Sequence, residues 1–414
     1  MNEKLLHTPE GVRDIYDTEC KKRNQIIKRL HHVLDLYSYH DIQTPSFEFF
    51  DIFNVDEWFG SSNELYKFFD RENNILVLRP DITPSIARCV AKYYDGEELP
   101  IRLCYQGNTF FNANNLQGKL REITQLGAEL IHDDSSAADA EVIATVIDCF
   151  LASGLTEFHV DIGQVDFLKG IIEEAELSVE TEMKIHELIH NKNFFALGEL
   201  IKTLDLTENI KQVLLSFDSL FGGLEMLDRA KGLVTNTRSI QAIERLEKVY
   251  AALSYYQYEQ YAGFDFSQLS GYGYYTGIVF RGYTYEASDA VVKGGRYNNL
   301  LKQFGKEAPA IGFAFYIDDL MMALNRQKIE VAIDNADQIV LYNAENQKAA
   351  ITLANRYRKE YKKIELIRKS ARKTLEDYIS YGKKKHFNSM LYLESDSSAI
   401  EINFVTGETK NVTL

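Results

Sequence analysis

The chain has 414 residues, a length that suggests two or three domains. Its hydrophobic fraction of 45% and charged fraction of 26% are typical of a globular protein. The net charge of −15 argues against non-specific nucleic-acid binding by the whole chain, because phosphates attract Lys and Arg. No run of roughly 18 apolar residues predicts a membrane span, and the N-terminus lacks the apolar segment of a signal peptide. We therefore expect a cytoplasmic protein.

The four cysteines, Cys20, Cys89, Cys104 and Cys149, are widely spaced and form no C-x-x-C pair. This spacing indicates neither a metal site nor a disulfide framework. It fits a reducing cytoplasm. We therefore expect no metal and no cofactor.

The first 165 residues predict helices that alternate with strands. Periodic apolar residues indicate a helix over 17–37, and Pro45 suggests that a strand within 39–50 bends or lies at an edge. The helix over 83–94 should begin with Thr83 as N-cap and Pro84 at its first position. The other predicted elements are strands over 65–70, 75–80, 101–111, 121–131 and 158–164, and a helix over 136–153.

The pattern then turns helical over about 166–250 and returns to β character before a helix predicted over 312–324. This order predicts an α+β core over 1–325 with a helical insertion. Residues 331–414 alternate strands and helices, with 14 Lys and Arg against 11 Asp and Glu, although the whole chain is acidic. This shift predicts a separate small α/β domain.

Segments spread over residues 8–320 carry, in order, the motifs of a known family. They are TPEGVRDI (8–15), HDIQTPSFE (40–48), LRPDITPSIAR (78–88), QGKLREITQLGAELI (117–131), YYTGIVF (274–280), GGRYNNL (294–300) and PAIGFAFYIDDL (309–320). The set resembles the class II histidyl-tRNA synthetases and their paralogue family, the regulatory subunits of ATP phosphoribosyltransferase. The resemblance implies an antiparallel-sheet core, a tail similar to an anticodon-binding domain, and a dimer interface at Pro45.

The resemblance also implies a pocket for free histidine. The family's contacts to the amino group and the imidazole ring correspond here to Asp81, Thr83, Gln125, Glu129 and Tyr275. Carboxylates bind cations by charge-assisted hydrogen bonds worth roughly 1.5–3 kcal/mol each. The alternative is that Asp81 and Thr83 cap a helix, and that Gln125 and Glu129 are outward strand positions. Replacing Glu129 with Ala should weaken histidine binding and leave folding largely intact.

Three arginines that the synthetases use to bind phosphates are replaced. Their positions correspond to Phe111, Ser270 and Asp319, and no Arg occurs in 109–116 or 265–280. Losing a single transition-state donor typically costs about 10²–10³ in rate. The resemblance therefore implies that adenylate formation is absent.

Two other patterns have simpler interpretations. HELIH (186–190) matches the H-E-x-x-H zinc pattern, but it is short and lies in the helical insertion, where we expect a solvated helix face. Basic residues over 356–385 could form a nucleic-acid surface, but charge runs on helices are usually solvated, so we do not expect nucleic-acid binding.

The resemblance implies a regulatory subunit that does no chemistry itself. Such a subunit activates short-form ATP phosphoribosyltransferase in the first step of histidine biosynthesis and helps feedback regulation by L-histidine. The implied assembly is a homodimer within a hetero-oligomer, with a hetero-octamer among the sizes considered. A divergent histidyl-tRNA synthetase, or a tRNA-binding or amino-acid-sensing module, is the alternative.

Overall fold

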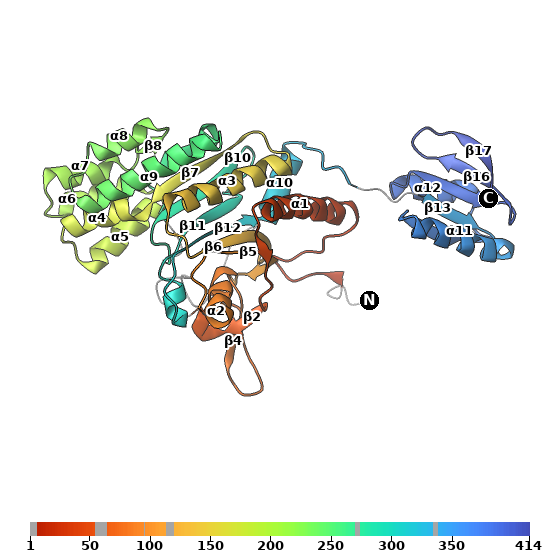
Figure 1. Ribbon diagram of the computed structural model, residues 1–414, viewed down its shortest axis with the longest axis horizontal. Helices are drawn as coiled ribbons and strands as arrows, with labels where there is room; N and C mark the ends of the chain where they lie inside the picture. Colours follow the sequence, from red (N-terminus) through yellow and green to blue (C-terminus); the bar gives the residue numbers. More distant parts are fainter. Residues whose placement is uncertain (1–5, 54–63, 95, 113–119, 270–273, 334–337) are drawn as a thin grey trace. The chain divides into compact units, whose positions relative to one another are not determined.

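The computed structural model describes residues 6–53, 64–94, 96–112, 120–269, 274–333 and 338–414 (Figure 1). The chain divides into two compact units, Met1–Val331 and Ala332–Leu414. Within the described ranges, no helix is both long and apolar enough to cross a membrane.

A nine-stranded sheet forms the centre of the first unit. Its strands, in spatial order, are β1 (His40–Asp41), β5 (Ile101–Phe110), β6 (Glu122–Ile131), β12 (Ala310–Tyr316), β11 (Val292–Arg296), β10 (Ile278–Thr284), β7 (Phe158–Gln164), β9 (Ala262–Asp265) and β8 (Phe221–Gly222). The predicted α+β class is confirmed, but the sheet is mixed rather than wholly antiparallel. The pairs β1–β5 and β7–β9 are parallel. Parallel neighbours need long crossovers, and the helical insertion supplies the crossover from β7 to β9.

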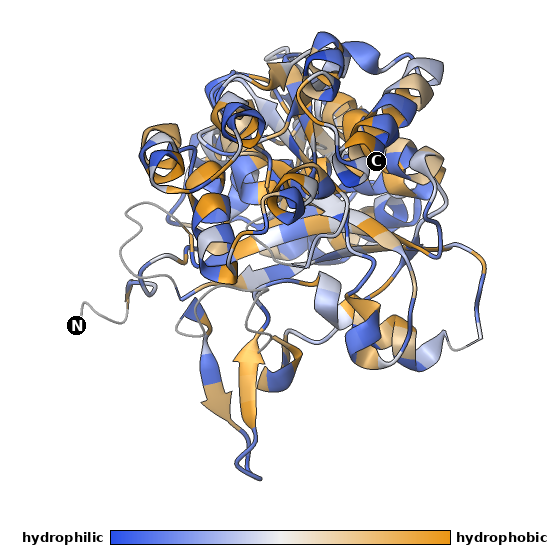
Figure 2. Cartoon of the chain, turned by 90° about the vertical axis from the view of Figure 1, so that its left-hand side faces the viewer, coloured by the Kyte–Doolittle hydropathy of each residue, from blue (hydrophilic) through white to orange (hydrophobic). Residues whose placement is uncertain are grey.

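In the strands at the middle of this sheet, successive side chains point to opposite faces, so apolar and polar side chains lie on different faces. On β6, Leu126 and Leu130 belong to the main hydrophobic core. Gln125 and Glu129 point to the other face and are also buried. One face of the sheet therefore packs against helices, and the other carries polar groups. Figure 2 shows that hydrophobic and hydrophilic residues both occur along the helices and strands of the chain.

Three helices cover the apolar face: α1 (Asp17–Leu36), α3 (Ser136–Ser153) and α10 (Ile317–Arg326) (Figure 1). The helix predicted over 312–324 was wrong in its first part, because residues up to Tyr316 belong to β12. Short apolar runs buried on both faces do not distinguish a strand from a helix by periodicity. Helix α2 (Thr83–Tyr93) packs in a separate hydrophobic cluster with Tyr105 and Tyr274.

The insertion consists of helices with side-chain N-caps at five of their starts. The capping residues, each of which accepts a hydrogen bond from a backbone N–H of the helix that follows, are Gln164, Ser178, Asn193, Thr207 and Asn236. Buried residues of these helices belong to the same hydrophobic cluster as the large sheet. The helices are α4 (Val165–Glu174), α5 (Val179–His190), α6 (Phe194–Thr203), α7 (Glu208–Ser216), α8 (Glu225–Lys231) and α9 (Thr237–Tyr255).

A three-stranded sheet extends away from the large sheet (Figure 1). It contains β2 (Phe47–Phe49), β4 (Ile75–Leu78) and β3 (Lys67–Phe69), all antiparallel, and confirms the strands predicted over 65–70 and 75–80. Short 3₁₀ turns occur at η2 (Phe50–Ile52), η4 (Glu259–Tyr261), η5 (Leu301–Phe304) and η6 (Ala344–Asn346).

The second unit is a five-stranded sheet with one helix on each face. Its strand order is β14 (Ile364–Arg368), β13 (Gln338–Tyr342), β15 (Ser389–Leu393), β16 (Ser398–Asn403) and β17 (Thr409–Thr413). Helices α11 (Gln347–Lys359) and α12 (Leu375–Lys384) contribute to two different hydrophobic clusters. The sequence did not predict β17. The unit thus has its own apolar core.

Candidate functional site

A polar cavity lies on the face of the large sheet that carries Gln125 and Glu129. All five residues assigned to the amino-acid pocket line it, so residues distant in sequence meet in one place: Asp81, Thr83, Gln125, Glu129 and Tyr275. The large sheet supplies the polar floor, and the start of α2 and the segment after residue 273 supply the walls.

Glu129 lines the cavity and is 1% exposed. The Thr83 hydroxyl donates to Glu129 Oε1 at 2.7 Å, and the Tyr297 hydroxyl donates to Oε2 at 2.5 Å. Gly312 leaves the space for this carboxyl group, since a Cβ there would lie 1.6 Å from Oε2. Burial raises the pKa of Glu129 to about 8, although the two hydroxyls act in the opposite direction. The side chain is therefore mostly protonated at neutral pH.

Asp81 joins the start of α2 to the opposite wall. Its Oδ1 accepts from the backbone N–H of Ile82 at 2.7 Å and of Thr83 at 3.4 Å, and its Oδ2 accepts from the Tyr274 hydroxyl at 2.8 Å. Burial raises the pKa of Asp81, while these bonds lower it. The predicted N-cap at Thr83 was wrong. Thr83 lies inside α2, Ile82 is the N-cap, and the Thr83 hydroxyl binds Glu129 instead.

Two buried polar atoms in the cavity have no hydrogen-bond partner among the described residues. They are Gln125 Oε1 and the Tyr105 hydroxyl oxygen, on side chains that are 1% and 4% exposed. An unpaired buried acceptor typically costs about 1–3 kcal/mol. These atoms therefore favour a ligand that donates hydrogen bonds, such as an ammonium group.

The cavity is narrow. Its volume is about 20 Å³, and a single water molecule needs about 10–15 Å³. The Tyr275 ring fills one side and packs on Gly295, where a Cβ would lie 2.7 Å from the ring. The rings of Tyr274 and Tyr275 are 4.8 Å apart. An amino acid would therefore have to displace side chains to enter.

The three positions that the resemblance aligns with synthetase arginines supply no positive charge. Phe111 follows β5, and its backbone N–H donates to the Arg121 carbonyl at 2.9 Å. Asp319 lies in the first turn of α10. Ser270 lies outside the described residues. Among the described residues that line the cavity, Lys293 is the only cation, and it pairs with Asp289 at 3.2 Å.

The H-E-x-x-H pattern forms part of α5, where His190 Nδ1 lies 3.0 Å from the Leu269 carbonyl oxygen. Glu187 pairs with Lys184 at 2.7 Å. In the described parts of the chain, this motif contributes to no cluster of three metal ligands. These contacts agree with a helix face rather than a zinc site.

Pro45 is exposed, and its carbonyl accepts from Arg79 Nη1 at 3.0 Å. The same nitrogen donates to the Thr44 carbonyl at 2.9 Å. Arg79 thus fixes the bend before β2. A dimer interface at this segment stays a prediction.

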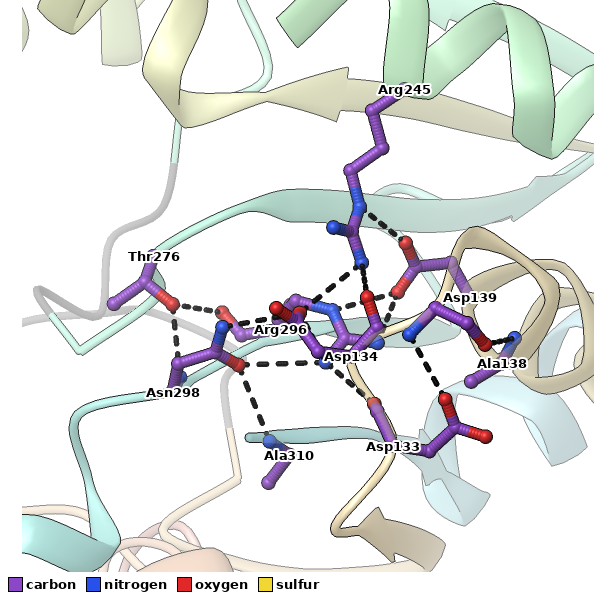
Figure 3. A network of polar contacts seen from close by, with 10 residues as sticks. Asp133, Asp134, Ala138, Asp139, Arg245, Thr276, Arg296, Asn298 and Ala310 are labelled. Carbon is purple, nitrogen blue, oxygen red and sulfur yellow. Dashed lines mark hydrogen bonds and ion pairs between the residues drawn. The ribbon is translucent and has the colours of Figure 1, made fainter. Parts of the chain in front are cut away.

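A buried ionic network supports the strand end next to the cavity (Figure 3). Arg296 donates to Asp139 Oδ1 from Nη2 at 2.6 Å and from Nε at 2.8 Å, and Arg245 of α9 donates to Asp139 Oδ2 at 2.7 Å. Tyr297, the neighbour of Arg296, holds Glu129. This network was not predicted from the sequence, in which the GGRY motif was its only signal.

Comparisons with known proteins agree with this architecture. The histidyl-tRNA synthetase family model matches residues 11–320. The ATP phosphoribosyltransferase regulatory subunit of Acetivibrio thermocellus is 36% identical over 414 residues, covering 100% of this chain and 99% of that protein. The protein of the same name from Ruminiclostridium cellulolyticum is 36% identical over 413 residues, covering 99% of this chain and 98% of that protein.

Solved structures give the same result. A Bacillus halodurans structure described as an ATP phosphoribosyltransferase regulatory subunit/histidyl-tRNA synthetase has a TM-score of 0.84 at 31% identity, covering 94% of this chain and 98% of that one. Histidyl-tRNA synthetase from Nostoc sp. PCC 7120 has a TM-score of 0.81 at 18% identity, covering 98% and 96%, which supports the fold alone. The resemblance inferred from the motifs is confirmed, and the chain belongs to the ATP phosphoribosyltransferase regulatory subunits, a family with the histidyl-tRNA synthetase fold.

Proposed function

We propose that the protein is a non-catalytic regulatory subunit of ATP phosphoribosyltransferase and acts in the first step of histidine biosynthesis. The observation that carries this proposal is the 36% identity with a regulatory subunit along the full length of both chains. The cavity adds support, because its described lining residues include the five that the resemblance assigns to amino-acid binding and contain no arginine for ATP phosphates.

The partner that this function requires is a catalytic subunit, which we propose to be the short form that condenses ATP with phosphoribosyl pyrophosphate. We place the two in a cytoplasmic hetero-oligomer, up to a hetero-octamer, built on a homodimer of this chain that meets near Pro45. We assign residues 331–414 as the counterpart of an anticodon-binding domain, without an RNA-binding role.

We assign L-histidine as the ligand of the cavity. Asp81, Thr83, Gln125 and Glu129 supply acceptors for its ammonium group and ring, and Tyr275 borders the ring. Both carboxyl groups are buried, with raised pKa values. A cation between them stabilises their ionised forms, so binding should expel a proton. If bound histidine weakens formation of the active assembly, that assembly must weaken histidine binding by the same factor.

The test measures phosphoribosyl-ATP formation by a purified short-form catalytic subunit with and without this chain. We expect little activity from either protein alone, and activity that histidine inhibits when the two are mixed. Failure to raise activity with a cognate catalytic subunit would contradict the regulatory function.

A variant separates the function from the pocket assignment. Asp81→Asn should still activate the catalytic subunit but require more histidine for inhibition. Glu307→Gln is the matched control, because that side chain is 77% exposed and its ion pair with Lys302 at 3.0 Å lies on the surface, where such pairs contribute little. If Asp81→Asn is inhibited by histidine as strongly as the wild type, histidine does not bind in this cavity. The proposed regulatory function would be unaffected by that result.

A further inference from the structure

Three potential metal ligands meet at the edge of the large sheet, away from the polar cavity. They are His31 of α1, Asp41 of β1 and Cys104 of β5, and their ligand atoms all lie within 4.8 Å of one another. His31 Nε2 lies 2.7 Å from Asp41 Oδ1, and Cys104 Sγ lies 3.6 Å from the same oxygen. This trio contains one nitrogen, one oxygen and one sulfur ligand.

The backbone holds two of these residues in register. Strands β1 and β5 are parallel, with the Cα of Asp41 opposite that of Cys104, and the Ile42 N–H donates to the Cys104 carbonyl at 2.9 Å. Helix α1 is fixed on this face by buried residues such as Leu30 and Leu34. The ligands therefore stand on three packed elements rather than on a loop, which favours a defined geometry.

A second carboxylate orients the histidine. His31 Nδ1 lies 3.4 Å from Asp35 Oδ2, one helical turn away, so Nε2 is the nitrogen that faces Asp41 and Cys104. Metal-binding histidines almost always direct their other ring nitrogen to a carboxylate, a backbone carbonyl or water in this way. This contact is independent of the three ligands, and it gives the imidazole the orientation of a metal ligand.

Access to the cluster differs from ligand to ligand. The Cys104 side chain is buried, His31 is 32% exposed and Asp41 is 76% exposed. In the single chain, an ion can therefore arrive from solvent, and water can complete its coordination. Zinc–ligand distances of about 2.0–2.3 Å require the His31–Asp41 pair to open slightly. The exposed Asp41 side chain is free to move outward.

We propose that His31, Asp41 and Cys104 bind one divalent transition-metal ion, with water as a further ligand and Asp35 as the group that positions His31. A nitrogen, an oxygen and a thiolate ligand favour zinc over magnesium or calcium. Binding forms a metal–sulfur bond and releases the thiol proton to solvent. Burial raises the pKa of the Cys104 thiol to about 12, so the ion displaces this proton rather than meeting a free thiolate.

Cobalt titration of the untagged full-length chain tests the site, because a thiolate ligand gives a charge-transfer absorption that carboxylates and imidazoles do not. We expect one cobalt per chain, this absorption, and its loss when zinc is added. Cys104→Ser should abolish the absorption. Cys20→Ser removes a thiol of helix α1, to which the Asn24 side-chain amide donates at 3.8 Å, and should retain the absorption.

Surface variants keep the test independent of folding at the buried thiol. In competition with a chelator, His31→Gln and Asp41→Asn should each weaken zinc binding by more than tenfold. Asp35→Asn should weaken it by about 10–100-fold, as expected for a group that orients a ligand. Circular dichroism checks that each variant is folded. A wild-type chain without thiolate absorption, or the same zinc affinity in His31→Gln, would overturn the proposal.

Discussion

Replacing Glu129 with Gln should make the protein's stability less sensitive to pH. The pKa of this carboxyl rises from 4.5 in the unfolded chain to about 8 in the folded one. Between these values the unfolded state has lost a proton that the folded state keeps, so the free energy of unfolding falls as pH rises. The shift corresponds to a loss on the order of 4–5 kcal/mol by pH 8. Glutamine does not ionise and should lack this loss.

The same variant should alter histidine binding. At pH 7 the wild-type carboxyl is mostly protonated, since its pKa is about 8, and the ligand's ammonium group should expel close to one proton. Glu129→Gln should release fewer protons and should bind histidine about 10–150-fold more weakly, from the loss of about 1.5–3 kcal/mol. Calorimetry in buffers with different ionisation enthalpies measures both the affinity and the proton count.

Two results would refute this reasoning. One is that the free energies of unfolding of wild type and Glu129→Gln change with pH in the same way between pH 5 and 8. The other is equal proton release by both proteins. Glu129→Ala is a poorer probe than the sequence suggested, because the Tyr297 hydroxyl donates to this carboxyl at 2.5 Å and would lose its partner. We therefore expect Glu129→Ala to destabilise the fold by about 1–3 kcal/mol.

Other predictions concern the core, the chemistry and the assembly. Asp139→Asn should lower the free energy of unfolding, measured by urea denaturation, by about 3–5 kcal/mol, because it removes the charge that pairs with buried Arg296. The surface variant Glu307→Gln should change this free energy little. The protein should catalyse no histidine-dependent ATP–pyrophosphate exchange, and exchange at a synthetase-like rate would contradict the loss of the arginines. Light scattering at micromolar concentration should give a dimer mass, and a monomer mass would argue against an interface at Pro45.

Much of the site could be predicted because its residues lie in short motifs with a clear local geometry. Gln125 and Glu129 are four apart on one strand, so the period of two places them on the same face. The resemblance to the synthetase family also implied that Asp81 and Tyr275 would join them. Gln125 and Glu129 are buried rather than exposed to solvent, because α2 and Tyr274 cover the polar face of the sheet.

Side-chain pairs that are distant in sequence could not be predicted. Arg296 and Asp139 are 157 residues apart, and Cys104 and Asp41 are 63 apart, so neither pair has a local signal. The role of Thr83 was missed for a related reason. Its hydroxyl can bind either its own helix start or Glu129, and only the tertiary fold brings Glu129 within 2.7 Å.

The hydrophobic cluster common to the insertion and the large sheet has a consequence for local opening. Residues such as Leu188 and Leu246 of the inserted helices pack in the same cluster as Leu126 of β6. Segments with a continuous core open together rather than one at a time. Amide hydrogens at the centre of α9 should therefore exchange with solvent as slowly as those of β6. Any signal that loosens the inserted helices would then have to loosen the pocket floor as well.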